Sequence, residues 1–242
     1  MGYNFFTYES ELPRGVGFGL FGVWHFVWLT ALGVLAACLL RWYARLQERG
    51  RRVWEYTVSF SLVLWIILRS IYIAGIGASF LYELPLHLCS VTGILCALHC
   101  VTGADWMGQV LYAIGLPGTA LALLFPDWGK YPAIHFITIE GFFFHAGILV
   151  YVLGLLCSKK IVPQRSKLWQ VVLFLVAYMI PIYVFDRTCQ VNYMFLSRPS
   201  AGSPLVLLLR WFGDPGYLIA YVGLIFLCVY VMEAGYKRFF TS

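Results

Sequence analysis

Charged residues are scarce in this sequence. Only 12% of its 242 residues are Asp, Glu, Lys or Arg, whereas 61% are hydrophobic. A soluble globular domain is about half apolar and about a quarter charged. One soluble core cannot hide this much apolar surface, so lipid is the expected solvent for most of the chain.

Motifs for nucleotides and metals are also lacking. The sequence has no Gly-rich phosphate loop and no Ser-centred nucleophile elbow. Its seven cysteines are an odd number, and most lie in apolar runs, so no disulfide framework is expected. Cys96, His99 and Cys100 are close in sequence, but on a helix His99 points about 100° away from Cys100. We predict no metal site and no cofactor.

The N-terminal segment does not have the pattern of a cleavable signal peptide. Glu9, Glu11 and Arg14 precede the first apolar run, whereas a signal peptide begins with basic residues. We therefore expect the first hydrophobic span to be retained. The net charge is +6, but the basic residues lie in short loops between apolar spans, so we expect no nucleic-acid binding.

Seven segments have the length and hydropathy of membrane spans, which need about 20 residues. They cover approximately residues 18–40, 54–77, 81–101, 107–125, 133–157, 168–185 and 216–233. The apolar stretch 204–212 is too short to cross and is predicted to be interfacial or re-entrant. No repeat or long linker divides the chain. We predict one all-α domain over residues 1–242, a polytopic bundle of seven transmembrane helices.

Loop charges predict how this bundle is oriented. With seven spans, the loops after the first and fifth spans and the C-terminal tail lie on one side, and they hold 11 of the 17 basic residues. Basic loops stay in the cytosol. The prediction is therefore a multi-pass protein of the cell membrane, with the N-terminus outside and the C-terminus cytosolic.

Polar residues gather in the outer half of the predicted bundle. Ionisable groups inside a bilayer are costly and indicate a functional site. Apart from Cys96, His99 and Cys100, the inner half contains almost none. We expect a polar cavity that opens outward or to the outer leaflet. Its groups come from four spans and two outer loops: Arg69, His87, Cys89, Asp127, His135, Glu140, His145, Asp186, Arg187, Asn192 and Tyr193.

Cys89 is the best candidate for a nucleophile. A thiol reacts when a nearby base or cation favours its thiolate, and Arg69 lies at a similar depth. His87 points about 200° round a regular helix from Cys89. The base is therefore expected from the fifth span, either His145 or His135. The other interpretation is that Cys89 is a packed small residue.

The remaining polar residues are expected to bind substrate. Glu140 would orient a histidine or form a structural pair with Arg69, because buried charges need partners. An oxyanion would be met by Arg69 or by donors such as Asn192 and Tyr193. His87 completes this predicted substrate-binding set.

Several segments together resemble a known family. Leu-Pro-Leu-His-Leu-Cys-Ser stands at 84–90, Leu-Leu-Phe-Pro-Asp at 123–127 and Asn-Tyr-Met-Phe-Leu at 192–196, with Pro199 shortly after. Their order and spacing resemble the bacterial YwaF-like integral membrane proteins. Those proteins are similar to the eukaryotic transmembrane protein 164 family.

The resemblance implies a lipid acyltransferase that moves fatty acyl chains between phospholipids through a cysteine and a histidine. It places the cysteine at Cys89 and the histidine at His145. His135 remains a competitor, because Ala146 stands where the family has a Gly directly after the His. The reaction would pass through a thioester acyl-enzyme, and water as acceptor would make the protein a phospholipid acyl hydrolase. The alternative is a non-catalytic transporter or lipid-binding protein that uses the same cavity.

Overall fold

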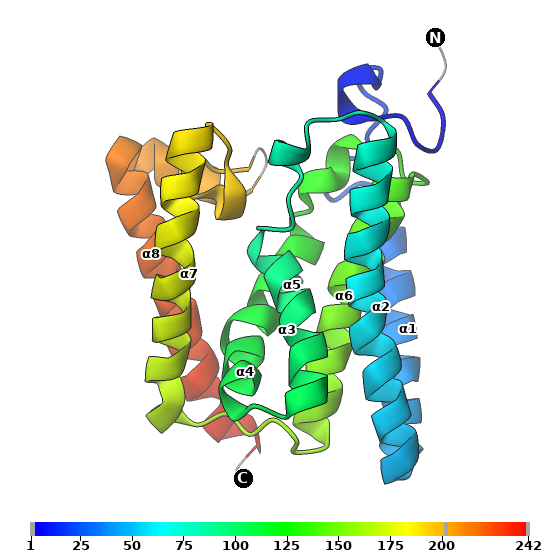
Figure 1. Cartoon of the computed structure of the whole chain (residues 1–242), viewed down its shortest axis with the longest axis vertical. Helices are drawn as coiled ribbons and strands as arrows, with labels where there is room; N and C mark the ends of the chain where they lie inside the picture. The colour runs from blue at the N-terminus through cyan, green and yellow to red at the C-terminus, as the bar shows by residue number, and fades with distance from the viewer. Residues whose placement is uncertain (1–2, 201–202, 241–242) are drawn as a thin grey trace.

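The fold is a bundle of helices, shown in Figure 1 as a computed structural model that describes residues 3–200 and 203–240. Within these residues every regular element is helical, which confirms the all-α class. The longer helices are α1 (Val23–Arg45), α2 (Glu48–Gly75), α3 (Leu88–Thr102), α6 (Phe136–Cys157), α7 (Leu168–Cys189) and α8 (Leu205–Phe240). The shorter ones are η1 (Glu9–Glu11), η2 (Phe80–Tyr82), α4 (Asp105–Val110), η3 (Leu111–Gly115), α5 (Leu116–Leu124), η4 (Asp127–Lys130), η5 (Arg165–Lys167) and η6 (Tyr193–Phe195).

Six helical stretches of the described chain are long and apolar enough to cross a membrane, which confirms a polytopic membrane protein. The predicted third span is the exception. It corresponds to α3, which has 15 residues. At about 1.5 Å per residue that helix is about 22 Å long, less than the hydrocarbon thickness of about 30 Å. The six stretches are Val23–Arg45, Glu48–Gly75, Asp105–Lys130, Phe136–Cys157, Arg165–Cys189 and Leu205–Met232.

The two ends of the bundle differ. We call the end where α1 and α6 begin and where α2 and α7 end the upper end, which is at the top of Figure 1. The last turns of α8 lie at the opposite, lower end. The loops α1–α2 and α6–α7 are also at the lower end, as the predicted alternation of spans requires.

The prediction of a helical span from residue 81 is wrong, because α3 begins only at Leu88. Pro85 has no backbone N–H and disfavours a helical conformation of Leu84 before it. Residues 83–87 instead enter the bundle from the upper end as an irregular segment (Figure 1). Irregular backbone at membrane depth is tolerated only where protein or a hydrated cavity covers it.

Tyrosine hydroxyls supply the hydrogen bonds that this irregular segment lacks. Tyr193 Oη accepts a hydrogen bond from Leu84 N at 2.9 Å and donates one to Leu81 O at 2.6 Å. Tyr178 Oη donates to Leu86 O at 2.7 Å. These bonds hold the segment before α3 in place and satisfy its partly buried backbone groups.

α6 is the central helix and packs against α1, α2, α3 and α5. In its most apolar window 72% of the residues are buried, against 11% in α1, so α1 must rely on lipid to cover its surface. Glycines allow the close approach of neighbours. A Cβ added at Gly147 would lie 2.8 Å from Leu62 Cδ2, and one added at Gly141 would lie 2.7 Å from Trp128 Cδ2. Small residues at such positions are typical of membrane helix interfaces.

Two interruptions shape the other helices. The α4–η3–α5 helix contains a π-helical turn at η3, just before Pro117, whose missing N–H removes one bond to the preceding turn. α8 is broken at Gly213, which has a φ of 62° and non-helical ψ. The break separates the short apolar stretch 205–212 from the predicted seventh span, as the sequence indicated.

The lower half is more polar than predicted. Tyr43 Oη donates to Glu55 Oε1 at 2.6 Å, and Lys160 Nζ lies 3.0 Å from the same oxygen. The His99 ring is hydrogen-bonded to the Tyr151 hydroxyl at 3.2 Å. The expectation that this half holds almost no polar groups apart from Cys96, His99 and Cys100 is wrong, because α2 begins at Glu48 and carries the buried Glu55 two turns into the bundle. Lys160, in the loop after α6, balances the charge of Glu55, and the Tyr43 hydroxyl of α1 adds a hydrogen bond.

Candidate functional site

Cys89 lies in the first turn of α3, where the irregular segment becomes helical. Its thiol is free and half-buried, and it packs against the main apolar core. The N-cap residue, His87, makes no side-chain cap to this helix. Among the described residues, the amides of Leu88 and Ser90 have no hydrogen-bond acceptor. Such a first turn presents unpaired N–H groups and the positive end of the helix dipole, which favour an anion.

The face of α3 that carries Cys89 packs toward α6. Gly93 follows Cys89 by four residues, and positions i and i+4 share one face of a helix. A Cβ added at Gly93 would lie 2.7 Å from Phe144 Cζ of α6. This contact sets the register of the two helices next to His145.

His145 is buried on α6, and its hydrogen bond defines its tautomer. Its Nδ1 lies 2.6 Å from Gly141 O. A carbonyl oxygen only accepts, so Nδ1 carries the proton and Nε2 keeps a lone pair. One face of the ring stacks on Trp128, with centroids 4.8 Å apart. The imidazole is thus held in the form that a general base requires.

The surroundings of His135 are different. It is the N-cap of α6, and its Nδ1 accepts a hydrogen bond from Ile137 N at 3.2 Å. Its Nε2 donates to Thr7 O at 3.0 Å. Both ring nitrogens are therefore used in holding the start of α6 and the N-terminal segment, and burial lowers the pKa of His135.

His87 has the opposite tautomer to His145. Its Nδ1 accepts a hydrogen bond from Met194 N at 3.4 Å, so the proton is on Nε2. The ring also lies against Tyr193 and Phe195, with centroids 5.1 and 5.5 Å apart. His87 can therefore act as a hydrogen-bond donor beside the first turn of α3.

Arg69 is held between two carboxylates. Its Nη2 lies 2.7 Å from Glu83 Oε2, and its Nη1 lies 3.0 Å from Glu140 Oε2. Tyr8 Oη donates to the second oxygen of Glu83 at 2.9 Å. This network ties α2, α6 and the segment before α3 together, as expected for a structural pair. It also leaves no net positive charge on Arg69 and its partners.

Asn192 and Tyr193 have partners within the chain. Asn192 Oδ1 accepts hydrogen bonds from Ser197 N and Arg198 N, at 3.1 and 3.2 Å, which closes the loop that contains η6. Tyr193 is held by its backbone N–H, which donates to Asp186 Oδ1 at 2.9 Å. Both residues position the loop against the segment that leads into α3.

The model of the TMEM164 family matches residues 20–233. The chain belongs to the TMEM164 family. No curated protein and no solved structure matches it. The relationship predicted from the sequence is thereby confirmed, and in this TMEM164 family member the match covers Cys89 and every histidine of the candidate site.

The structure also shows contributors that the sequence did not single out. Trp128 supports the His145 ring, and Glu83 is the closer partner of Arg69 in this TMEM164 family chain. Trp128 directly follows the Pro126–Asp127 motif, which was the one local signal for it. Among the described residues, no hydrogen bond joins Cys89 to a histidine ring.

Proposed function

We propose that this protein is a membrane-embedded lipid acyltransferase in which Cys89 is the nucleophile and His145 the base. The observation that carries the proposal is the His145–Gly141 hydrogen bond, which leaves an unprotonated Nε2 on the helix against which α3 packs. The uncapped first turn of α3 supplies a suitable setting for the thiolate of Cys89. His135 is the weaker candidate, since both of its nitrogens have structural partners.

The reaction has two displacements. His145 Nε2 takes the proton of Cys89, and Sγ attacks the carbonyl carbon of a phospholipid ester. The C–S bond forms, the ester C–O bond breaks, and the leaving lysophospholipid oxygen takes the proton from His145. An acceptor hydroxyl then gives its proton to His145 and attacks the thioester. The C–S bond breaks, and the thiolate leaves and is reprotonated; with water as acceptor, the product is a fatty acid.

The oxyanion would be stabilised by the free amides of Leu88 and Ser90 and by the Nε2–H of His87. Preorganised donors of this kind are worth about 10²–10³ in rate for each donor. Arg69 is not proposed to stabilise the oxyanion, because its guanidinium is already paired with Glu83 and Glu140. The roles of Arg69, Glu140, Asn192 and Tyr193 in the proposed enzyme are to hold the segment before α3.

The upper end is proposed to face the outside of the cell membrane. Basic residues gather in the loops of the lower end, and basic loops remain in the cytosol. The site then lies in the outer half of the bilayer, where phospholipid esters are within reach of Cys89 and the acyl chain stays in lipid. The basic residues of the lower-end loops and the adjoining helix ends are Arg45, Arg49, Arg51, Arg52, Lys159, Lys160, Arg165 and Lys167.

Intact-protein mass spectrometry tests the mechanism. Purified protein is mixed with phospholipids that carry a deuterated acyl chain, and we expect an acyl adduct that hydroxylamine removes, together with lysophospholipid. Cys89→Ala should abolish the adduct, whereas Cys38→Ala, at an exposed cysteine of α1, should keep it. His145→Gln should slow adduct formation by about 10²–10⁴.

A folded Cys89→Ala protein that still transfers acyl chains would eliminate this mechanism. Phospholipid that stays bound to the unmodified protein, with no adduct and no lysophospholipid, would instead favour the non-catalytic lipid-binding alternative.

A further inference from the structure

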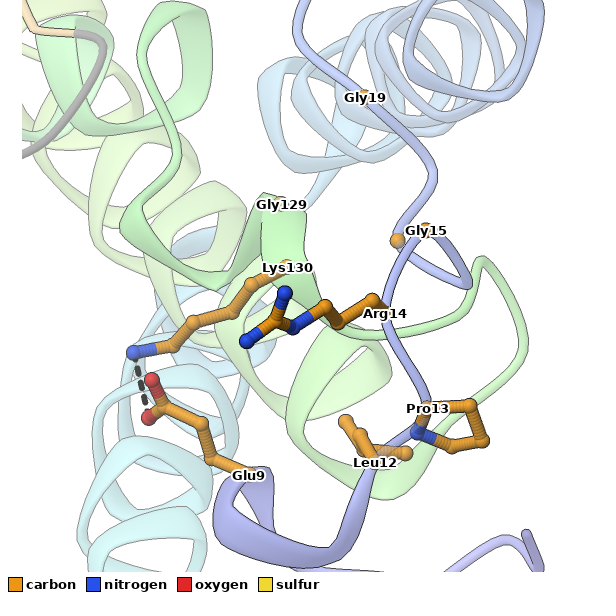
Figure 2. A pocket seen from close by; sticks show the side chains of 9 residues that line it. Glu9, Leu12, Pro13, Arg14, Gly15, Gly19, Gly129 and Lys130 are labelled. Carbon is orange, nitrogen blue, oxygen red and sulfur yellow. Dashed lines mark ion pairs between the residues drawn. The ribbon is translucent and has the colours of Figure 1, made fainter. Parts of the chain in front are cut away.

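A second feature lies at the upper end, away from Cys89. A cavity of about 360 Å³ opens between the segment before α1 and the η4 turn (Figure 2). Its lining carries three charged side chains and is otherwise made mainly of glycine backbone: Glu9, Leu12, Pro13, Arg14, Gly15, Gly17, Gly19, Gly129 and Lys130.

The charges of this cavity favour an anion. Lys130 Nζ forms an ion pair with Glu9 Oε2 at 2.6 Å. Arg14 is exposed and has no carboxylate partner in the described part of the chain. In the view of Figure 2 its guanidinium points to the side of the cavity where Lys130 lies. Two cations and one carboxylate leave the cavity one positive charge.

The glycines shape the walls of the cavity. Gly15 has a φ of +83°, a left-handed conformation that turns the chain around the cavity directly after Arg14. A Cβ added at Gly17 would lie 2.5 Å from Gly129 O, so only glycine permits the two walls to meet there. The amides of Gly19 and Gly129 already donate to Gly129 O and Pro126 O, so the charged side chains are the main donors that this cavity offers to an anion.

The position of the cavity relative to α1 indicates the source of the anion. α1 has 23 residues, about 34 Å at 1.5 Å per residue, and slightly exceeds the hydrocarbon thickness of about 30 Å. Its first residues are exposed and apolar, with Val23 at 79% and Trp24 at 51% exposure. Tryptophan favours the membrane interface. A cavity formed by residues 9–19 therefore lies at headgroup level, directly above a lipid-facing helix.

We propose that this cavity binds the phosphodiester of an anionic phospholipid headgroup. Arg14 donates hydrogen bonds to the phosphate oxygens, and the Lys130–Glu9 pair sets the charge balance. The acyl chains lie along the exposed face at the start of α1. This site is independent of the proposed acyl transfer, since no residue of the Cys89 region lines it.

Titration of the full-length protein in detergent with dioleoylphosphatidylglycerol, followed by native mass spectrometry, tests the proposal. Arg14→Gln should weaken binding about tenfold, as expected when charge-assisted hydrogen bonds to phosphate are removed. Glu9→Gln should tighten binding about two- to fivefold, because it removes the competing carboxylate from Lys130. Arg210→Gln, at an exposed arginine near the start of α8, is the matched control and should leave the affinity unchanged.

Two further measurements separate the possible ligands. Dioleoylglycerol, which has no phosphate, should not bind, and inorganic phosphate should compete poorly because it lacks acyl chains. Cys89→Ala should bind phosphatidylglycerol as the unaltered protein does, so failure of the acyl-transfer mechanism leaves this result intact. The proposal is overturned by equal losses in Arg14→Gln and Arg210→Gln, by weaker binding in Glu9→Gln, or by inorganic phosphate that competes as well as the lipid.

Discussion

The imidazole of His145 stacks on the indole of Trp128, with ring centroids 4.8 Å apart and planes inclined by 27°. Gly141 contacts both rings. Its carbonyl oxygen accepts the Nδ1 proton of His145, and its missing side chain leaves room for the indole. The tautomer and the orientation of the proposed base therefore depend on a glycine one helical turn away.

Gly141→Ala should disturb this arrangement. The new methyl group would lie 2.7 Å from Trp128 Cδ2, so the indole must move. Overpacking of this kind costs about 1–3 kcal/mol. We expect that loss in the free energy of unfolding, measured by denaturant titration in detergent, and a slower rate of acyl-adduct formation. Gly118→Ala in α5, where an added Cβ meets nothing within 4 Å, is the control and should be neutral or slightly stabilising. Equal effects of the two substitutions would contradict the assigned contact.

Arg69→Met should destabilise the protein by leaving two carboxylates without their cation. Glu140 is buried and Glu83 nearly so, whereas the Arg69 side chain is 35% exposed. We therefore expect a loss of about 2–3 kcal/mol, below the 3–5 kcal/mol typical of a fully buried pair. Adding Glu140→Gln should recover part of this loss. Lys167→Met, which breaks the exposed pair with Asp105, should cost less than about 1 kcal/mol. A double variant no more stable than the single one would argue against the network.

Tyr193→Phe should loosen the segment that leads into α3. The variant loses the hydroxyl that serves both Leu84 N and Leu81 O. Each lost hydrogen bond is worth about 0.5–1.5 kcal/mol. Hydrogen exchange at the Leu84 amide should become faster, while α6 stays protected. Tyr183→Phe, at an exposed tyrosine of α7, should leave this exchange rate unchanged. Unaltered exchange in Tyr193→Phe would show that the hydroxyl does not hold the segment.

The stability of the α6 N-terminus should depend on pH through His135. Burial lowers the pKa of His135 below its ordinary value of 6.5. The unfolded chain therefore binds a proton first, and the free energy of unfolding falls as the pH drops below about 6.5. Above that value both states are neutral and His135 contributes no pH dependence. His135→Asn retains an N-cap side chain but does not titrate, so it should flatten this part of the profile. An identical profile in His135→Asn would exclude His135 as the cause.

The sequence by itself determined that the chain lies in a membrane, that its fold is helical, and to which family it belongs. Hydropathy is a local property summed over about 20 residues, so spans such as 133–157 can be recognised without knowledge of their neighbours. The same local pattern identified Cys89, Arg69 and Glu140 as polar groups at membrane depth. The family followed from short motifs at fixed spacing.

The tertiary structure decided which partners each polar group meets. Arg69 meets Glu83 and Glu140, which are 14 and 71 residues away, and His145 meets Trp128 from another helix. The start of α3 depends on tyrosines more than 90 residues further along the chain. Such contacts depend on the register of packed helices, in which one residue turns a side chain by about 100°. Composition and spacing do not determine that register, and for this reason the contacts that distinguish His145 from His135 could be described only in the folded chain.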